Sequence, residues 1–129
     1  MTLLLFALLL GPPPPAEDPI GSRLYPPELI MKHQQELGID DKQREAIMKE
    51  VASAQAQAMR LQWQLAELVE TLTRLLDAAP VDEAKAVAQA ERVMNLERDV
   101  KKTHLVLLIR LKNLLTDAQR AKLVALRKP

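Results

Sequence analysis

Cysteine is absent from this chain of 129 residues, and aromatic residues make up only 2% of it. The lack of cysteine excludes disulfide frameworks, zinc fingers and cysteine nucleophiles. Three glycines are too few for a glycine-rich phosphate loop, and the shortage of aromatics argues against an extended β-architecture. Because His33 and His104 are the only histidines, neither a three-histidine metal site nor a Ser-His-Asp triad is expected within one chain. We therefore expect neither an enzyme nor a cofactor.

The residues that are present suit one folded unit. Hydrophobic residues make up 48% of the chain and charged residues 27%, with 18 Lys and Arg against 17 Asp and Glu. This balance is typical of globular rather than disordered proteins. The length fits a single domain.

The first nineteen residues differ in composition from the rest. An apolar run at 2–10 is followed by Gly11, four prolines and the acidic pair at 17–18. The run is too short for a bilayer, which needs about 20 residues, but it suits the apolar part of a secretory signal. We interpret 1–19 as a signal-like segment with a proline-rich tether, and 20–129 as the folded domain. A buried N-terminal helix is the alternative.

Two long helices are predicted, at 41–77 and at about 82–113. In the first, nine apolar residues recur at alternating spacings of four and three, which is typical of a coiled-coil seam. Asp77 to Pro80 ends that helix, since proline lacks an N–H. In the second, a stripe from Val93 to Leu114 can face the seam, while 105–111 is apolar nearly all round and must be covered by other residues. The seam positions are Ile47, Val51, Ala54, Ala58, Leu61, Leu65, Leu68, Leu72 and Leu75.

Two short helices complete an all-α fold of four helices built on an antiparallel hairpin. One is predicted from about Tyr25 to Leu37, ended by Gly38, and the other from Thr116 to about 126. Residues 39–44 and 115–120 repeat one helix-start signal. It pairs Asp40 with Gln43 and Thr116 with Gln119 as capping residues.

The repeated start signal resembles the LTxxQ motif of the Spy/CpxP family of periplasmic proteins. Residues 115–119 match in full, whereas Ile39 and Asp40 replace Leu and Thr in the first copy; residues 81–86 also resemble the start of the family's third helix. The resemblance covers about 25–126. It implies a periplasmic, cradle-shaped antiparallel dimer that acts as an ATP-independent chaperone for partly unfolded proteins, or as a heavy-metal sensor or resistance protein.

Candidate contact residues fall in two groups. Opposite the first seam lies a weaker stripe that includes Met59 and Trp63, which either contacts clients or packs in a dimer. From Arg98 onward the chain contains nine basic residues and only two acidic ones. Arg98, Lys101 and Lys102 are therefore candidates for attracting acidic, partly unfolded proteins. Nucleic acid is disfavoured because no aromatics are interleaved with the basic residues.

The candidate metal ligands are His33, Glu97 and His104, with Glu36 as a further donor. Glu97 and His104 share one helix face, but Lys101 stands between them. No His-x-x-x-His or methionine-rich cluster occurs. A metal site is therefore the weaker hypothesis, and His104 is expected at the helix surface or seam edge. A structural module that docks on a periplasmic partner or a membrane-bound sensor is the remaining alternative.

Overall fold

The computed structural model describes residues 18–127. That part of the chain is helical and contains no strand, which confirms the all-α prediction. Residues 1–17, and with them most of the predicted signal-like segment, lie outside it. The elements are η1 (Gly21–Arg23), α2 (Pro27–Lys32), α3 (Gln34–Leu37), α4 (Asp41–Asp77), α5 (Glu83–Leu114) and α6 (Asp117–Arg127).

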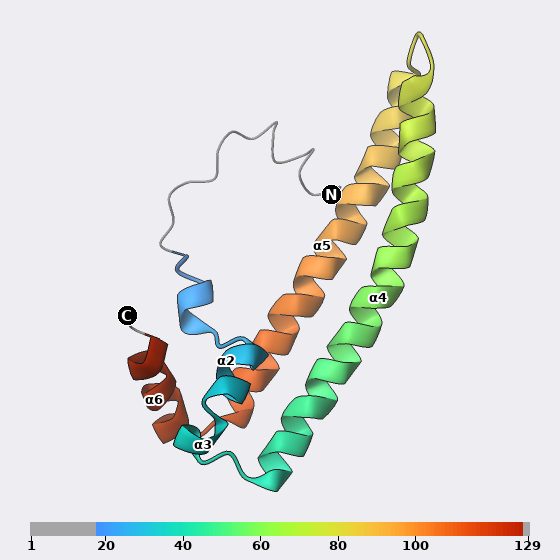
Figure 1. The fold of residues 1–129 in the computed structure, drawn as a ribbon. Helices are drawn as coiled ribbons and strands as arrows, with labels where there is room; N and C mark the ends of the chain where they lie inside the picture. Colours follow the sequence, from blue (N-terminus) through green and yellow to red (C-terminus); the bar gives the residue numbers. More distant parts are fainter. Residues whose placement is uncertain (1–17, 128–129) are drawn as a thin grey trace.

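The two long helices pack side by side as an antiparallel hairpin (Figure 1). All nine predicted seam residues of α4 are buried or half-buried. Facing them, α5 buries Ala86, Gln89, Val93 and Leu107. The Gln89 amide donates across the hairpin to the Leu68 carbonyl over 2.9 Å. The alternating spacing therefore predicted the contact face of α4 correctly.

The long helices begin where the sequence predicts. The Asp40 carboxylate accepts from the Gln43 N–H at 2.7 Å, and the Asp82 carboxylate accepts from the Lys85 N–H at 3.1 Å. Each bond satisfies one backbone N–H that an α-helix leaves without an internal partner at its start. Gly38 has a φ of 68° and a ψ of 40°, the left-handed conformation that only glycine adopts without cost.

The single helix predicted from Tyr25 to Leu37 is wrong. The segment forms two short helices, because His33 has a φ of −109° and a ψ of 21° and so leaves the helical region between them. Tyr25 precedes the first of these helices and is only 4% exposed. Tyr25 and Pro26 each precede a proline, which disfavours the helical region; Pro26 is extended, and the helix begins at Pro27 instead.

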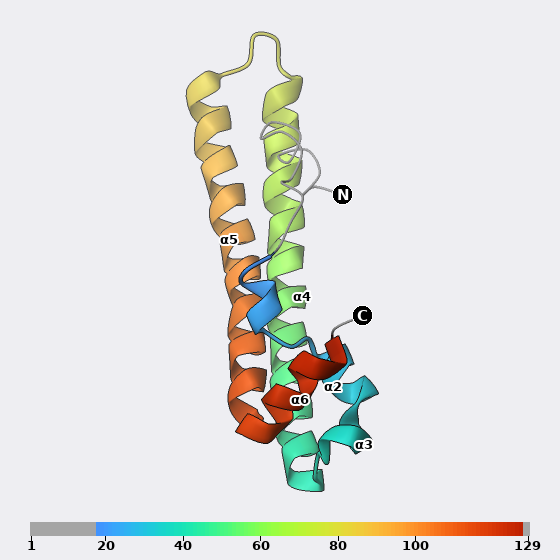
Figure 2. The same ribbon diagram turned by 90° about the vertical axis from the view of Figure 1, so that its left-hand side faces the viewer.

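The short helices cover the base of the hairpin (Figure 2). Their apolar residues Ile30, Leu37 and Leu123 form one core with Leu107 and Leu111 of α5. Leu111 and Leu123 are fully buried. The apolar C-terminal half of α5 is thus covered in part, as predicted, although Leu105 and Ile109 remain 39% and 43% exposed.

Beyond the base, α4 and α5 continue as an arm of two helices with no third element packed on them in the described residues (Figures 1 and 2). Most seam residues of this arm are half-buried, and only Leu61, Ala86, Gln89 and Val93 are buried. No helix within residues 18–127 is both long and apolar enough to cross a membrane.

Leu61 tests the packing of the arm because it is 7% exposed in the seam. Leu61→Ala should lower the free energy of unfolding by about 2–5 kcal/mol, the usual range for a buried leucine that leaves a cavity. The neighbouring Gln62→Ala changes an exposed side chain and should stay within about 0.5 kcal/mol. Urea unfolding followed by circular dichroism measures both, and equal losses would show that the seam is misplaced.

Candidate binding surfaces

The two copies of the helix-start motif meet at the base of the hairpin. The side-chain amide nitrogen of Gln43 donates to the side-chain oxygen of Gln119 at 2.6 Å. The side-chain nitrogen of Gln119 in turn lies 3.1 Å from the side-chain oxygen of Gln43. The same amides reach backbone carbonyls, Gln43 that of Leu114 at 2.9 Å and Gln119 that of Leu37 at 3.2 Å. The motif therefore joins the start of α4 to the start of α6.

The two copies do not act alike. Thr116 and Gln119 form the predicted reciprocal capping box, in which the Gln119 N–H donates to the Thr116 hydroxyl at 3.2 Å and the Thr116 N–H donates to the Gln119 side chain at 2.9 Å. In the first copy Asp40 caps α4, but the Gln43 side chain does not reach back to it. Its amide instead donates to the Leu114 carbonyl of α5 and to the Gln119 side chain of α6, which are 71 and 76 residues away in the sequence. Tertiary bonding overrides the local pattern there.

Most of the basic residues near the C-terminus donate to backbone carbonyls of other segments. Lys112 donates to the Arg23 carbonyl at 2.8 Å, Lys122 to the Glu36 carbonyl at 2.6 Å, and Arg127 to the Leu24 carbonyl at 2.8 Å. Lys112 and Arg127 also lie 5.9 and 5.8 Å from the ring centre of Tyr25. These side chains fasten the N-terminal segment to α5 and α6.

Two further basic residues are also paired. Arg120 donates to the Leu115 carbonyl at 2.6 Å and contacts Asp117, and Arg110 lies 3.3 Å from the Glu50 carboxylate. In this part of the chain the basic side chains are thus engaged in contacts within the fold. Lys128 lies outside the described residues.

Arg98, Lys101 and Lys102 remain on the outside of α5. Arg98 makes only a long contact of 4.0 Å to Asp99, and both lysines are exposed. At 100° per residue, the half-exposed apolar residues of α5 lie on the same side of the helix as Arg98, with the two lysines on its flanks. We call this the α5 outer face; its apolar residues are Val87, Met94, Leu105 and Ile109, which are 39–52% exposed, and Glu91 is its acidic residue.

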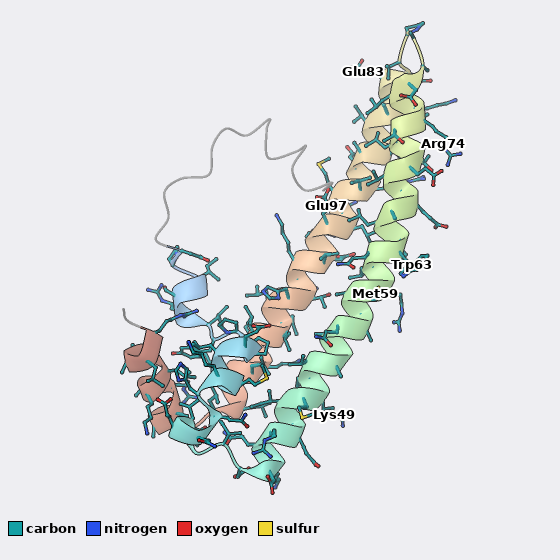
Figure 3. All side chains as sticks on the ribbon, in the orientation of Figure 1. Lys49, Met59, Trp63, Arg74, Glu83 and Glu97 are labelled. Carbon is teal, nitrogen blue, oxygen red and sulfur yellow. The ribbon has the colours of Figure 1, made fainter. Side chains whose placement is uncertain are left out.

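Met59 and Trp63 lie on the other long helix, as Figure 3 shows. They are 57% and 73% exposed. Trp63 follows the buried Leu61 by two residues, which is about 200° around the helix, so it projects away from α5. Met48, 61% exposed, lies on this side too. Sequence reasoning missed it, although its spacing of four residues from Ala52 was visible.

The sequence-predicted contact residues therefore form two surfaces rather than one. Glu50–Arg110 and Gln89–Leu68 link the long helices at two levels. Met59 and Trp63 lie between these levels on α4, and the basic trio lies between them on α5. The two groups lie at the same level along the arm but project to opposite sides of it.

The groove between the long helices is smaller than a typical small-molecule site. The groove between α4 and α5 has a volume of about 230 Å³ and is bordered by Glu50, Ser53, Gln57 and Lys102 among others. Small-molecule sites commonly measure about 300–1,000 Å³. The Glu50–Arg110 ion pair also occupies one part of this groove.

The candidate metal ligands are not brought together. His33 contacts Glu36 at 3.1 Å beside the break between α2 and α3. His104 is exposed and Glu97 half-exposed on α5. Within residues 18–127 no group of three His, Asp or Glu side chains has the proximity needed to hold a metal ion.

Comparison with known proteins identifies no relative, since no protein-family model, curated protein or solved structure matches the chain. The binding surfaces are therefore interpreted from their own chemistry.

Gln119 tests the link between the two motifs. Gln119→Ala removes bonds to Gln43, Thr116 and the Leu37 carbonyl, and it should lower the free energy of unfolding by about 1–3 kcal/mol because buried partners lose their bonds. Amides of α6 should exchange faster with solvent than those in the middle of α4. The exposed Gln35→Ala is the control. Equal stability of the two variants would contradict the link.

Proposed function

We propose that this protein is a non-enzymatic, chaperone-like protein that binds partly unfolded proteins without ATP. The observation that carries the proposal is the α5 outer face. There, four half-exposed apolar side chains share one side of a helix with Arg98, Lys101 and Lys102. A partly unfolded acidic protein offers both the apolar groups and the negative charge that such a face attracts.

The character of this face suits transient binding of variable partners. Met94 has an unbranched, polarizable side chain that adapts to irregular surfaces. The flexible Lys101 and Lys102 side chains attract negative charge without imposing the fixed geometry of a bidentate arginine. Binding of this kind is weak at each point and requires no enclosed pocket, in agreement with the shallow groove beside it.

The resemblance to the Spy/CpxP family supports the same proposal. Residues 115–119 carry the full LTxxQ pattern, and the structure gives Thr116 and Gln119 a capping role. On this basis we propose a periplasmic location and an antiparallel homodimer with the shape of a cradle.

The proposal predicts that the purified protein suppresses aggregation of an unfolding acidic client without ATP. Lys101→Glu/Lys102→Glu should raise the protein concentration needed for half-suppression roughly tenfold, because reversed charges repel the client. Suppression by the unaltered protein should weaken as NaCl is raised from 0.15 to 0.5 M. Added salt shortens the Debye length, which is about 8 Å at physiological ionic strength, and so screens the attraction between the lysines and the client. Light scattering during heating of the client measures each effect.

Lys85→Glu/Arg92→Glu is the matched control. It makes the same change of charge on the same helix, at exposed positions outside the α5 outer face. Suppression should stay near that of the unaltered protein. Equal loss in both double variants would show that net charge alone matters, and an absence of suppression at several-fold excess over client would reject the proposed function.

A further inference from the structure

The outer side of α4 carries a second apolar stripe at coiled-coil spacing. All its members are exposed, and they recur at intervals of four, four, three, four and three residues. Charged residues lie on this side only beyond the two ends of the stripe, with Glu45 and Glu70 nearest to it. We call this the outer stripe of α4; it comprises Met48, Ala52, Ala56, Met59, Trp63 and Ala66. α4 therefore presents two such seams, and only one faces α5.

The outer stripe has a self-complementary order of large and small residues: Met, Ala, Ala, Met, Trp, Ala. When a second α4 is laid antiparallel about a two-fold axis near residues 57 and 58, Trp63 lies opposite Ala52 of the second copy. Met59 then lies opposite Ala56, and Met48 opposite Ala66. Each bulky side chain meets an alanine in all the pairs, and a two-fold axis repeats each pair. A parallel arrangement would instead place Trp63 against Trp63 and Met59 against Met59.

One pair of opposite charges beside the stripe favours the same register. Lys49 and Glu67 are eighteen residues apart, which is five turns, so they share one flank of the helix. In the antiparallel pair each Lys49 lies beside Glu67 of the second copy, where opposite charges attract. Glu45 comes near Glu70, but Glu70 already lies 3.7 Å from Arg74 within α4.

We infer that the outer stripe of α4 is the contact between two copies of this chain, which pair antiparallel through α4. The inference rests on the dimer proposed above and assigns its interface. It also places Met59 and Trp63 between the copies and leaves the α5 outer face of each copy open to clients. The axis lies close to the middle of α4, so the two α4 helices overlap along nearly their whole length.

The first test is Ala56→Glu. Ala56 is exposed in the single chain, but in the dimer it would bury two carboxylates near the axis. The dimer dissociation constant should rise about 100-fold or more, because an unpaired buried charge is strongly unfavourable. Ala88→Glu, at an exposed alanine of α5, is the matched control and should remain dimeric. Sedimentation velocity at micromolar concentration compares the variants.

The second test determines the register of the pair. Because the chain has no cysteine, single substitutions provide unique cross-linking sites. Ala56→Cys, near the axis, should be joined to its symmetry mate by a short bifunctional maleimide. Ala66→Cys should not, since the two sites would be about 25 Å apart along the axis at 1.5 Å per residue.

The outcomes distinguish a failure of the proposed interface from a failure of the proposed client binding. Equal cross-linking at both sites would indicate a parallel pair and overturn the inference. A monomer at 50 μM without cross-links would also overturn it, while the aggregation assay with Lys101→Glu/Lys102→Glu would still report on the α5 outer face. A dimer insensitive to Ala56→Glu would place the interface elsewhere.

Discussion

A hairpin of two helices can bury only one side of each helix, and this constraint governs the whole structure. The seam from Ile47 to Leu75 supplies the contact along the arm, yet most of its residues are only half-buried. The outer sides of α4 and α5 have no covering element in the described residues. The side chains on these outer sides are therefore available for contact with other molecules. The two sides differ in charge: the α4 stripe is uncharged along its middle, whereas the α5 outer face mixes apolar and basic residues.

The base has the opposite character from the arm. Five segments converge there, and polar side chains satisfy the backbone groups that the short helices leave unpaired. Gln43 and Gln119 connect α4 to α6, while Lys112, Lys122 and Arg127 bind carbonyls of the N-terminal segment. A long side chain with a charged end can cover apolar surface and still reach a distant carbonyl. This role accounts for four of the nine basic residues from Arg98 onward: Lys112, Arg120, Lys122 and Arg127.

The features that depend on local sequence could be predicted. The α4 seam follows from apolar spacing, and the helix starts at Asp40, Asp82 and Thr116 follow from capping chemistry. The features that depend on distant residues could not. No local pattern shows that His33 interrupts a helix, that the Gln43 side chain bonds to Gln119 rather than to the Asp40 backbone, or that Arg127 binds the Leu24 carbonyl. Likewise, the sequence shows that Trp63 and Lys101 lie on different helices but not that they project to opposite sides.

The sequence separation of the base contacts has a consequence for the order of folding. The hairpin can close from its tip, where Gln89 and Leu68 are 21 residues apart, and then extend one turn at a time. The contacts of Arg127 with Gly21 and Leu24 join residues 106 and 103 positions apart. Closing so long a loop costs more chain entropy than closing a short one, and contacts of this kind slow folding. During synthesis the N-terminal segment therefore lacks its complete docking site until the end of α5 and then α6 are made.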